Sequence, residues 1–322
     1  MKSETIGHLE FYNKRFNFDI FWDNIDKDEM DKDVDAFYKN VALAISKSSP
    51  SLQKRNLDFE KHWENIRNNE NAKNELFQTY RVMAMIGFWL EYKQIYKFDA
   101  DTLEMVANSE CKNLTAEELT ALKFPYNTFS IENDFKYKDF IIDSVLVSKQ
   151  TVTNGDVVLM IYAFVKGDAK ARLLRLDIVV EKDKTLFNFI ENHAELECQD
   201  FIKKVMNLVM YLCQPKAEVV KNRIIKKSDT SNKKKIKHFY NVSYDTNMVG
   251  VTLGNAIRNY KVIYEKGEST NHRTGGIKKP HLRCGHFHHY WVGKGRTELI
   301  AKYVEPVFVK GGSNDAVIHN VK

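Results

Sequence analysis

The sequence predicts an α+β fold, with helices in the N-terminal part of the chain and mainly antiparallel strands in the middle and C-terminal parts. Two observations predict this class. Apolar residues recur at helical spacing through residues 1–125, and after residue 139 they gather in short runs of Val, Ile, Leu and aromatic residues. A chain of 322 residues with 43% hydrophobic residues can form two or three compact units.

The first unit, residues 1–125, is predicted to be a helical region. Apolar side chains fall at helical spacing in Asp31–Ser48 and in Asn74–Tyr96. The methionine and aromatic residues of the second stretch are more typical of a packed core face than of a cofactor site, and we expect no cofactor. A capping-box pattern that begins at Thr115 predicts a short helix ending near Lys123.

The second unit, residues 126–215, is predicted to be an α+β domain made of a three-stranded antiparallel meander and two helices. The strands are predicted at Asp139–Ser148, Asp156–Val165 and Arg172–Glu181, and the helices at Lys184–Ala194 and Gln199–Cys213. The Asn154-Gly155 pair predicts a hairpin turn between the first two strands, because both residues tolerate the backbone angles of such turns.

Residues 216–238 are predicted to be a basic linker, and residues 239–322 a small, basic, β-rich C-terminal domain. The strands predicted in that domain are Phe239–Tyr244, Asn259–Tyr264, His286–Val292, Glu298–Val304 and Val307–Val309. Residues 216–322 contain 21 Lys and Arg against 8 Asp and Glu, a net charge of +13, which leaves −7 for residues 1–215. The basic part favours a polyanion partner; the alternative is a set of solvated faces that only keep the segment soluble.

Several function classes are disfavoured by the sequence. The N-terminus shows no apolar signal region, and no apolar run approaches the roughly 20 residues that cross a bilayer, so we expect a cytoplasmic protein without a membrane partner. The four cysteines are widely separated and form no Cys-x-x-Cys pair, which argues against a zinc ribbon and a disulfide framework.

Four of the ten histidines lie in one basic, aromatic segment, Lys278–Gly295. Histidine changes charge near neutral pH, arginine binds phosphates, and aromatic rings stack on bases, so the segment contains the groups of an RNA-handling or metal site. On an extended strand, residues two apart share a face. Cys284, His286, His288 and Tyr290 would therefore point to one side.

Three roles are open for this segment. The catalytic candidates, which would act as base, acid and cation on an RNA 2′-hydroxyl, are His281, Arg283, His286 and His288. The metal-ligand candidates are Cys284, His286 and His288, with no acidic residue close in sequence to complete the set. The third role is structural, since rings on a β-surface can simply brace neighbouring strands.

Cations and rings in this segment and in the basic linker are the nucleic-acid-binding candidates, because cations bind phosphates and rings stack on bases. They are Lys226, Lys227, Lys233, Lys234, Lys235, Lys237, Lys278, Lys279, Arg283, Tyr290, Trp291, Lys294 and Arg296.

The pattern Pro280-His281-x-Arg283-x-Gly285-His286-x-His288-x-Tyr290-Trp291-x-Gly293-x-Gly295, followed by Pro306-Val307-Phe308-Val309, resembles the C-terminal signature of the type V-A anti-CRISPR family that silences the effector nuclease through its mRNA. Gly254, Arg258 and Tyr260, and the β-rich block Leu122–Glu195, fall in matching order. This chain has Cys284 where the family pattern has arginine and His289 where it has glycine, so a cysteine-containing metal site would be particular to this chain.

The resemblance implies an anti-CRISPR-like regulatory protein of a mobile genetic element, such as a phage, acting in the cytoplasm of a bacterial host. Such a protein recognises a nascent polypeptide, either the effector nuclease or another target, and promotes degradation of its mRNA. The implied partners are that polypeptide, the mRNA or ribosome, and a host nuclease. Two alternatives stay open: a metal-independent ribonuclease that uses the C-terminal histidines, and an RNA-binding or structural accessory module.

Overall fold

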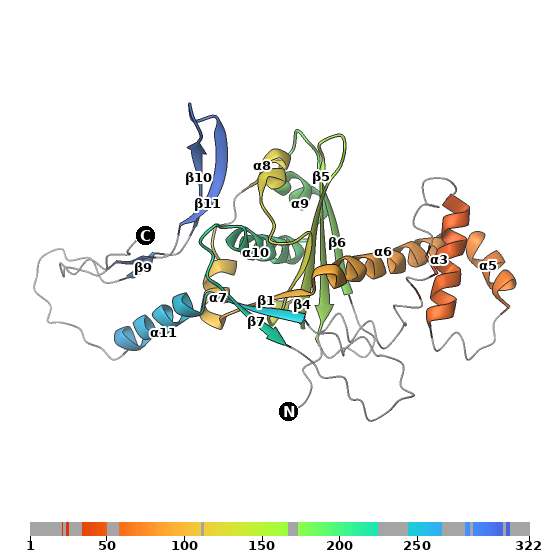
Figure 1. Cartoon of the computed structure of the whole chain (residues 1–322), viewed down its shortest axis with the longest axis horizontal. Helices are drawn as coiled ribbons and strands as arrows, with labels where there is room; N and C mark the ends of the chain where they lie inside the picture. The colour runs from red at the N-terminus through yellow and green to blue at the C-terminus, as the bar shows by residue number, and fades with distance from the viewer. Residues whose placement is uncertain are drawn as a thin grey trace, which may run out of the picture.

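The computed structural model of the chain describes residues 21, 24–25, 34–49, 58–110, 113–166, 173–224, 244–265, 281–283, 286–304 and 307–309. In these residues, helices and a mixed eight-stranded sheet confirm the predicted α+β class (Figure 1). None of the helices in these ranges is both long and apolar enough to cross a membrane.

The body of the protein is built on the eight-stranded sheet. Its strand order is β6-β5-β4-β2-β1-β8-β7, with β3 paired to β4. The strands are β1 (Gln94–Phe98), β2 (Thr128–Ile131), β3 (Phe135–Tyr137), β4 (Phe140–Thr151), β5 (Val157–Val165), β6 (Leu173–Val180), β7 (Val219–Ile224) and β8 (Tyr244–Val249). β1 is parallel to both of its neighbours, β2 and β8, whereas the remaining pairs are antiparallel.

Helices cover both faces of this sheet. In β4, Val145 and Val147 belong to the core that includes α7 (Ala100–Ala107) and α10 (Leu196–Leu212). Leu146, between them, belongs to the core formed with α6 (Glu70–Tyr92). Successive side chains of a strand point to opposite faces, so this alternation sets the two layers. The shorter helices α8 (Ala116–Ala121) and α9 (Leu186–His193) pack on the same side as α10.

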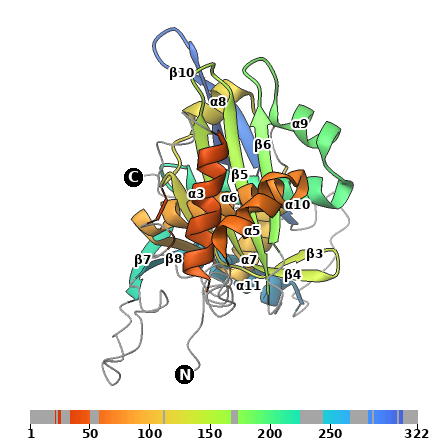
Figure 2. The same cartoon turned by 90° about the vertical axis from the view of Figure 1, so that its right-hand side faces the viewer.

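A helical lobe extends from the sheet along α6. It contains α3 (Val34–Ser48), α5 (Phe59–Arg67) and the outer part of α6 (Figures 1 and 2). Phe37, Val41, Trp63 and Leu76 form its buried core. The side chain of Asn69 caps the start of α6 by accepting from the backbone N–H groups of Asn71 and Ala72, which satisfies donors that have no partner inside the helix.

Two small sheets lie outside the main one. β10 (His286–Val292) and β11 (Glu298–Val304) form an antiparallel hairpin, and β9 (His281–Arg283) pairs with β12 (Val307–Val309). In Figures 1 and 2 the hairpin rises from the body and extends past α8.

Most of the predicted elements are confirmed. β4, β5 and β6 form the predicted antiparallel meander, with the Asn154-Gly155 turn between the first two strands and Gly155 at φ +92°. α9 and α10 lie at the two predicted helices, and Thr115 and Glu118 form the predicted capping box of α8. β10, β11 and β12 have the predicted bounds.

The prediction that residues 1–125 are helical is wrong at β1. The helix predicted to continue to Tyr96 ends at Tyr92, because Lys93 adopts the left-handed conformation at φ 52°. β1 follows at once and is buried at four of its five residues. A strand buried on both faces has the continuous apolar character of a buried helix, so the hydrophobic pattern alone did not separate the two.

The secondary structure predicted around the basic linker also needs correction. Val219–Ile224 form β7, an edge strand paired with β8, where a linker was predicted. The predicted strand Phe239–Tyr244 lies outside the described residues except for Tyr244, which begins β8. The main sheet therefore takes strands from all four predicted units.

The predicted strand Asn259–Tyr264 is wrong, since these residues belong to the helix α11 (Val251–Glu265). Their valine, isoleucine and tyrosine residues favour a strand locally. The start of the helix is fixed from outside by Glu218, whose carboxylate accepts from the backbone N–H of Thr252 at 2.9 Å and from its hydroxyl at 2.7 Å. This tertiary cap outweighs the local preference.

Candidate nucleic-acid interface

The predicted site residues fall into three groups in the structure. His286, His288, Tyr290 and Trp291 lie on β10, and Lys294 and Arg296 lie in the turn that follows it. His281 and Arg283 are the ends of β9, in the separate small sheet with β12. The predicted residues outside the described ranges are Lys226, Lys227, Lys233, Lys234, Lys235, Lys237, Lys278, Lys279 and Cys284.

The β10–β11 hairpin has a continuous register from the His286–Val304 pair to the Val292–Glu298 pair. Its turn needs left-handed backbone angles, with φ 84° at Gly293, 86° at Gly295 and 56° at Arg296. Glycine adopts such angles without steric cost, which explains the two glycines of the turn. The backbone N–H of Arg296 donates to the carbonyl of Gly293 at 3.1 Å and closes it.

One face of the hairpin presents a row of rings. The ring centroids of His286 and His288 are 6.5 Å apart, and those of His288 and Tyr290 are 4.7 Å apart. His288 and Tyr290 are exposed, and His286 is half-buried. We call the side chains of His286, His288, Tyr290 and Lys302 the ring face.

Lys302 belongs to the ring face because it lies directly opposite His288 in the register of β10 and β11. Directly opposed residues of an antiparallel pair point to the same side of the sheet. Its side chain is exposed. Sequence reasoning missed this cation, although counting back from the glycine turn along both predicted strands would have paired it with His288.

Trp291 lies on the other face of the hairpin and is 59% exposed. Trp63 and Trp89 are 5% and 0% exposed and belong to the hydrophobic cores. A large aromatic side chain left in water is a common feature of binding surfaces. Together with exposed Lys294 and Arg296 in the turn, it extends the basic and aromatic character around the hairpin end.

The base of the hairpin is connected to the body through the segment after α7. Glu110 forms a parallel backbone bridge with His286. The preceding turn is held by buried Asn207 of α10, whose Nδ2 donates to the carbonyls of Ala107 at 3.1 Å and Ser109 at 2.7 Å. A core helix therefore positions the strand on which the ring face begins.

The predicted catalytic and metal-binding sets are described only in part, because Cys284 and the side chains of His281 and Arg283 lie outside what the structure describes. His281 and Arg283 belong to a different sheet from His286 and His288. No group of three or more His, Cys, Asp or Glu side chains within the described ranges is arranged to hold a metal ion. Of the described cysteines, Cys198 is buried and Cys213 is half-buried, and desolvation raises the pKa of the Cys213 thiol to about 12, which keeps it in the unreactive neutral form.

Two residues of the family resemblance, Gly254 and Arg258, have a structural role. Arg258 Nη1 lies 2.9 Å from Asp99 Oδ1 and 2.8 Å from Asp101 Oδ2, and these hydrogen bonds raise the pKa of the guanidinium. Gly254 packs on the same carboxylate so closely that a Cβ atom there would be 1.8 Å from Asp99 Oδ1. We call these four residues the α11 clamp, because they hold α11 against the start of α7.

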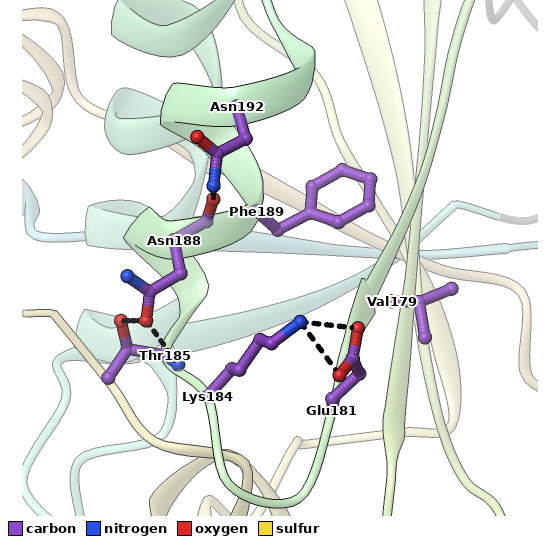
Figure 3. Close-up of a pocket in the computed structure, with 7 residues that line it drawn as sticks. All are labelled: Val179, Glu181, Lys184, Thr185, Asn188, Phe189 and Asn192. Carbon is purple, nitrogen blue, oxygen red and sulfur yellow. Dashed lines mark hydrogen bonds and ion pairs between the residues drawn. The ribbon is translucent and has the colours of Figure 1, made fainter.

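A surface hollow of about 240 Å³ lies between the end of β6 and α9 (Figure 3). Its polar groups largely bond to one another. Lys184 Nζ is 2.8 Å from Glu181 Oε2, and Asn188 Oδ1 accepts from the Thr185 backbone and hydroxyl at 3.0 and 2.7 Å. The hollow therefore presents no isolated charge to a ligand and is a weaker candidate than the hairpin.

Comparison with known proteins identifies one family. The model of the AcrVA2-like family, described as the anti-CRISPR type V subtype A2 family, matches residues 96–311, more than half of the chain. A solved structure titled "Crystal structure of AcrVA2" matches with a TM-score of 0.57 and 15% identity, over 95% of this chain and 100% of that one. At this identity the likeness shows a shared fold. No curated protein matches the chain.

Proposed function

The chain belongs to the AcrVA2-like anti-CRISPR family, and from this premise we propose that it is a regulator that acts on the message of its target. It recognises a nascent polypeptide, either the type V-A effector nuclease or another target, and promotes degradation of the mRNA being translated. Its partners are that polypeptide, the mRNA or ribosome, and a host nuclease that removes the message.

The observation that carries this proposal is the exposed β10–β11 hairpin in the basic part of the chain. Tyr290 and Trp291 are 41% and 59% exposed, and Lys294, Arg296 and Lys302 are exposed beside them. Cations and solvent-exposed rings are the groups that bind RNA phosphates and unpaired bases. Residues 1–215, with a net charge of −7, are left to hold a basic or apolar peptide.

We propose recruitment of a host nuclease, with cleavage by the chain itself as the alternative. The strands that carry the four catalytic candidates pair in two small sheets, His281 and Arg283 in one and His286 and His288 in the other. General acid–base catalysis would require their side chains within hydrogen-bond reach of one substrate, and the incubation of purified chain with message described below tests this.

A message-loss assay in cells tests the proposal. The chain is expressed with a type V-A effector gene, and the effector mRNA is measured relative to a control message. We expect the mRNA to fall when the N-terminal codons of the effector are translated in frame. A compensated frameshift that changes the N-terminal peptide but keeps the RNA nearly identical should restore the message. Equal loss of both messages would contradict peptide recognition.

A second measurement distinguishes recruitment from cleavage. Purified full-length chain is incubated with the same message, with and without a chelator and without ribosomes. We expect the message to stay intact. Cleavage that survives the chelator and disappears in His286→Ala would instead support the ribonuclease alternative.

A further inference from the structure

The ring face of the β10–β11 hairpin indicates which form of nucleic acid the protein binds. We propose that the ring face binds unpaired nucleic acid, with bases stacked on its rings and a phosphate held by Lys302. This inference rests on the proposed function, from which it takes the presence of RNA at the hairpin. It adds that the ligand is unpaired, that the ring face binds it, and that Lys302, which the sequence analysis did not name, contacts it.

The rings are arranged for contact with a chain of bases. His286, His288 and Tyr290 follow one another along a single face, with centroid separations of 6.5 and 4.7 Å. Their planes are inclined by 73° and 45°, so they do not stack fully on one another. His288 and Tyr290 are exposed, with Tyr290 at 41%. Ring surface that is not used in packing remains for a ligand.

Lys302 supplies the charge on this same face. It lies opposite His288, so its ammonium group reaches the surface beside the row of rings. Its side chain is exposed, and it forms no ion pair with any carboxylate whose side chain the structure describes. Arg258, by contrast, is held by two aspartates.

Rings beside a cation favour a single strand over a duplex. In a double helix the faces of the bases are covered by stacking, and the deep, narrow major groove of A-form RNA excludes side chains. On the ring face a duplex would gain only the phosphate contact of Lys302. An unpaired strand gains base–ring stacking as well, and every base offers a flat face for it.

Binding is measured with the full-length protein and labelled oligonucleotides of about 12 nucleotides, a length within the range covered by such surfaces. The probes are one unstructured RNA, DNA of the same sequence, and the blunt duplex of that RNA. We expect the single-stranded RNA to bind about tenfold or more tighter than the duplex, with RNA and DNA single strands within about threefold of each other.

Variants separate the contribution of the rings from that of the charge. Tyr290→Ala should weaken single-strand binding about tenfold and duplex binding less than twofold. Tyr290→Phe, which keeps the ring, should bind the single strand as tightly as the unchanged protein.

Lys302→Ala should reduce the slope of log affinity against log salt by about 0.7, the value of one phosphate contact on a single strand. Tyr290→Ala should leave that slope unchanged, because tyrosine carries no charge.

Two matched controls lie away from the hairpin. Phe88→Ala removes an aromatic side chain of the same exposure, 41%, from α6. Lys136→Ala removes an exposed cation from β3. We expect neither to change the affinity or its salt slope.

Several results would overturn the inference. They are equal binding of single strand and duplex, an unchanged affinity in Tyr290→Ala, or a preference for RNA over DNA above about thirtyfold, which would make ribose hydroxyl contacts the basis of binding. If the chain still removed its target message in cells, the proposed function would survive these results. If the binding results were as expected but the message stayed intact, the proposed function alone would fail.

Discussion

The α11 clamp and the β10–β11 hairpin both contain cations of the basic C-terminal part, but they use them in opposite ways. In the clamp, Arg258 is bonded to Asp99 and Asp101, whose side chains are 15% and 16% exposed. In the hairpin, Lys294, Arg296 and Lys302 point into solvent. Cations of the same basic part can therefore hold the fold in one place and stay exposed to solvent in another, and pairing and exposure tell the two apart.

The largest expected effect tests the clamp as a structural device. Gly254→Ala would place a Cβ atom 1.8 Å from Asp99 Oδ1, so either the Asp99 carboxylate must leave Arg258 and the start of α7 or α11 must move away from α7. We expect the free energy of unfolding to fall by about 2–3 kcal/mol, the cost of overpacking a rigid contact. Urea denaturation measures it. The matched control, Asn259→Ala at an exposed position of the same helix, should cost far less, and equal losses would contradict the steric argument.

A smaller effect is expected from removing the charge of the clamp. Arg258→Ala leaves Asp99 and Asp101 beside each other without their cation, so the denaturation midpoint should fall, but less than in Gly254→Ala. Arg258→Lys should recover only part of the loss, because a lysine ammonium cannot reproduce the fixed geometry of the guanidinium. Affinity for single-stranded RNA should stay unchanged. A loss of affinity without a loss of stability would place Arg258 in the binding surface.

At the end of the hairpin we expect the opposite result, a loss of RNA binding with little change in stability. The double variant Lys294→Ala/Arg296→Ala should change the free energy of unfolding by no more than about 0.5 kcal/mol, as is usual for exposed positions. It should weaken RNA binding and reduce the salt slope by about 1.4, two phosphate contacts on a single strand. Fluorescence titration at several salt concentrations measures both. An unchanged slope would show that these cations do not contact RNA.

The smallest effect is expected at Arg296, where one substitution distinguishes the role of the charge from that of the backbone conformation. Arg296 has φ 56°, a conformation that costs a non-glycine residue energy. Arg296→Gly should therefore make the hairpin more stable by about 0.5–1 kcal/mol while weakening RNA binding. Hydrogen exchange of the β10 and β11 amides measures the stability. Faster exchange in the variant would contradict this interpretation of the turn.

The elements that were predicted well are those whose local pattern of apolar and turn residues agrees with the secondary structure that their tertiary contacts favour. β10 and β11 have the predicted bounds because alternating residues flank a glycine turn, and Asn154-Gly155 places the hairpin between β4 and β5. α11 was missed because its cap comes from Glu218, 34 residues earlier, and its partner Asp99 lies farther still. β1 was missed because Lys93, rather than a glycine, ends the preceding helix.

The arrangement of the candidate site was predicted only where its residues are neighbours in the sequence. His286, His288, Tyr290 and Trp291 stand together in the sequence, and the strand alternation correctly assigned the first three to one face. Lys302 reaches that face only through cross-strand pairing. The separation of His281 and Arg283 into another sheet depends on β12, which follows β10 and β11 in the chain and pairs back to β9.

The central position of β1 has a consequence for how the protein is made. Its two neighbours are β2, which follows soon after it, and β8, which begins at Tyr244. During synthesis one edge of β1 has no partner until three quarters of the chain has been made, and pairing over such a separation is slow. Products that stop before residue 244 would expose this edge and tend to aggregate. Shortened versions of the protein should therefore keep the whole span from β1 to β8.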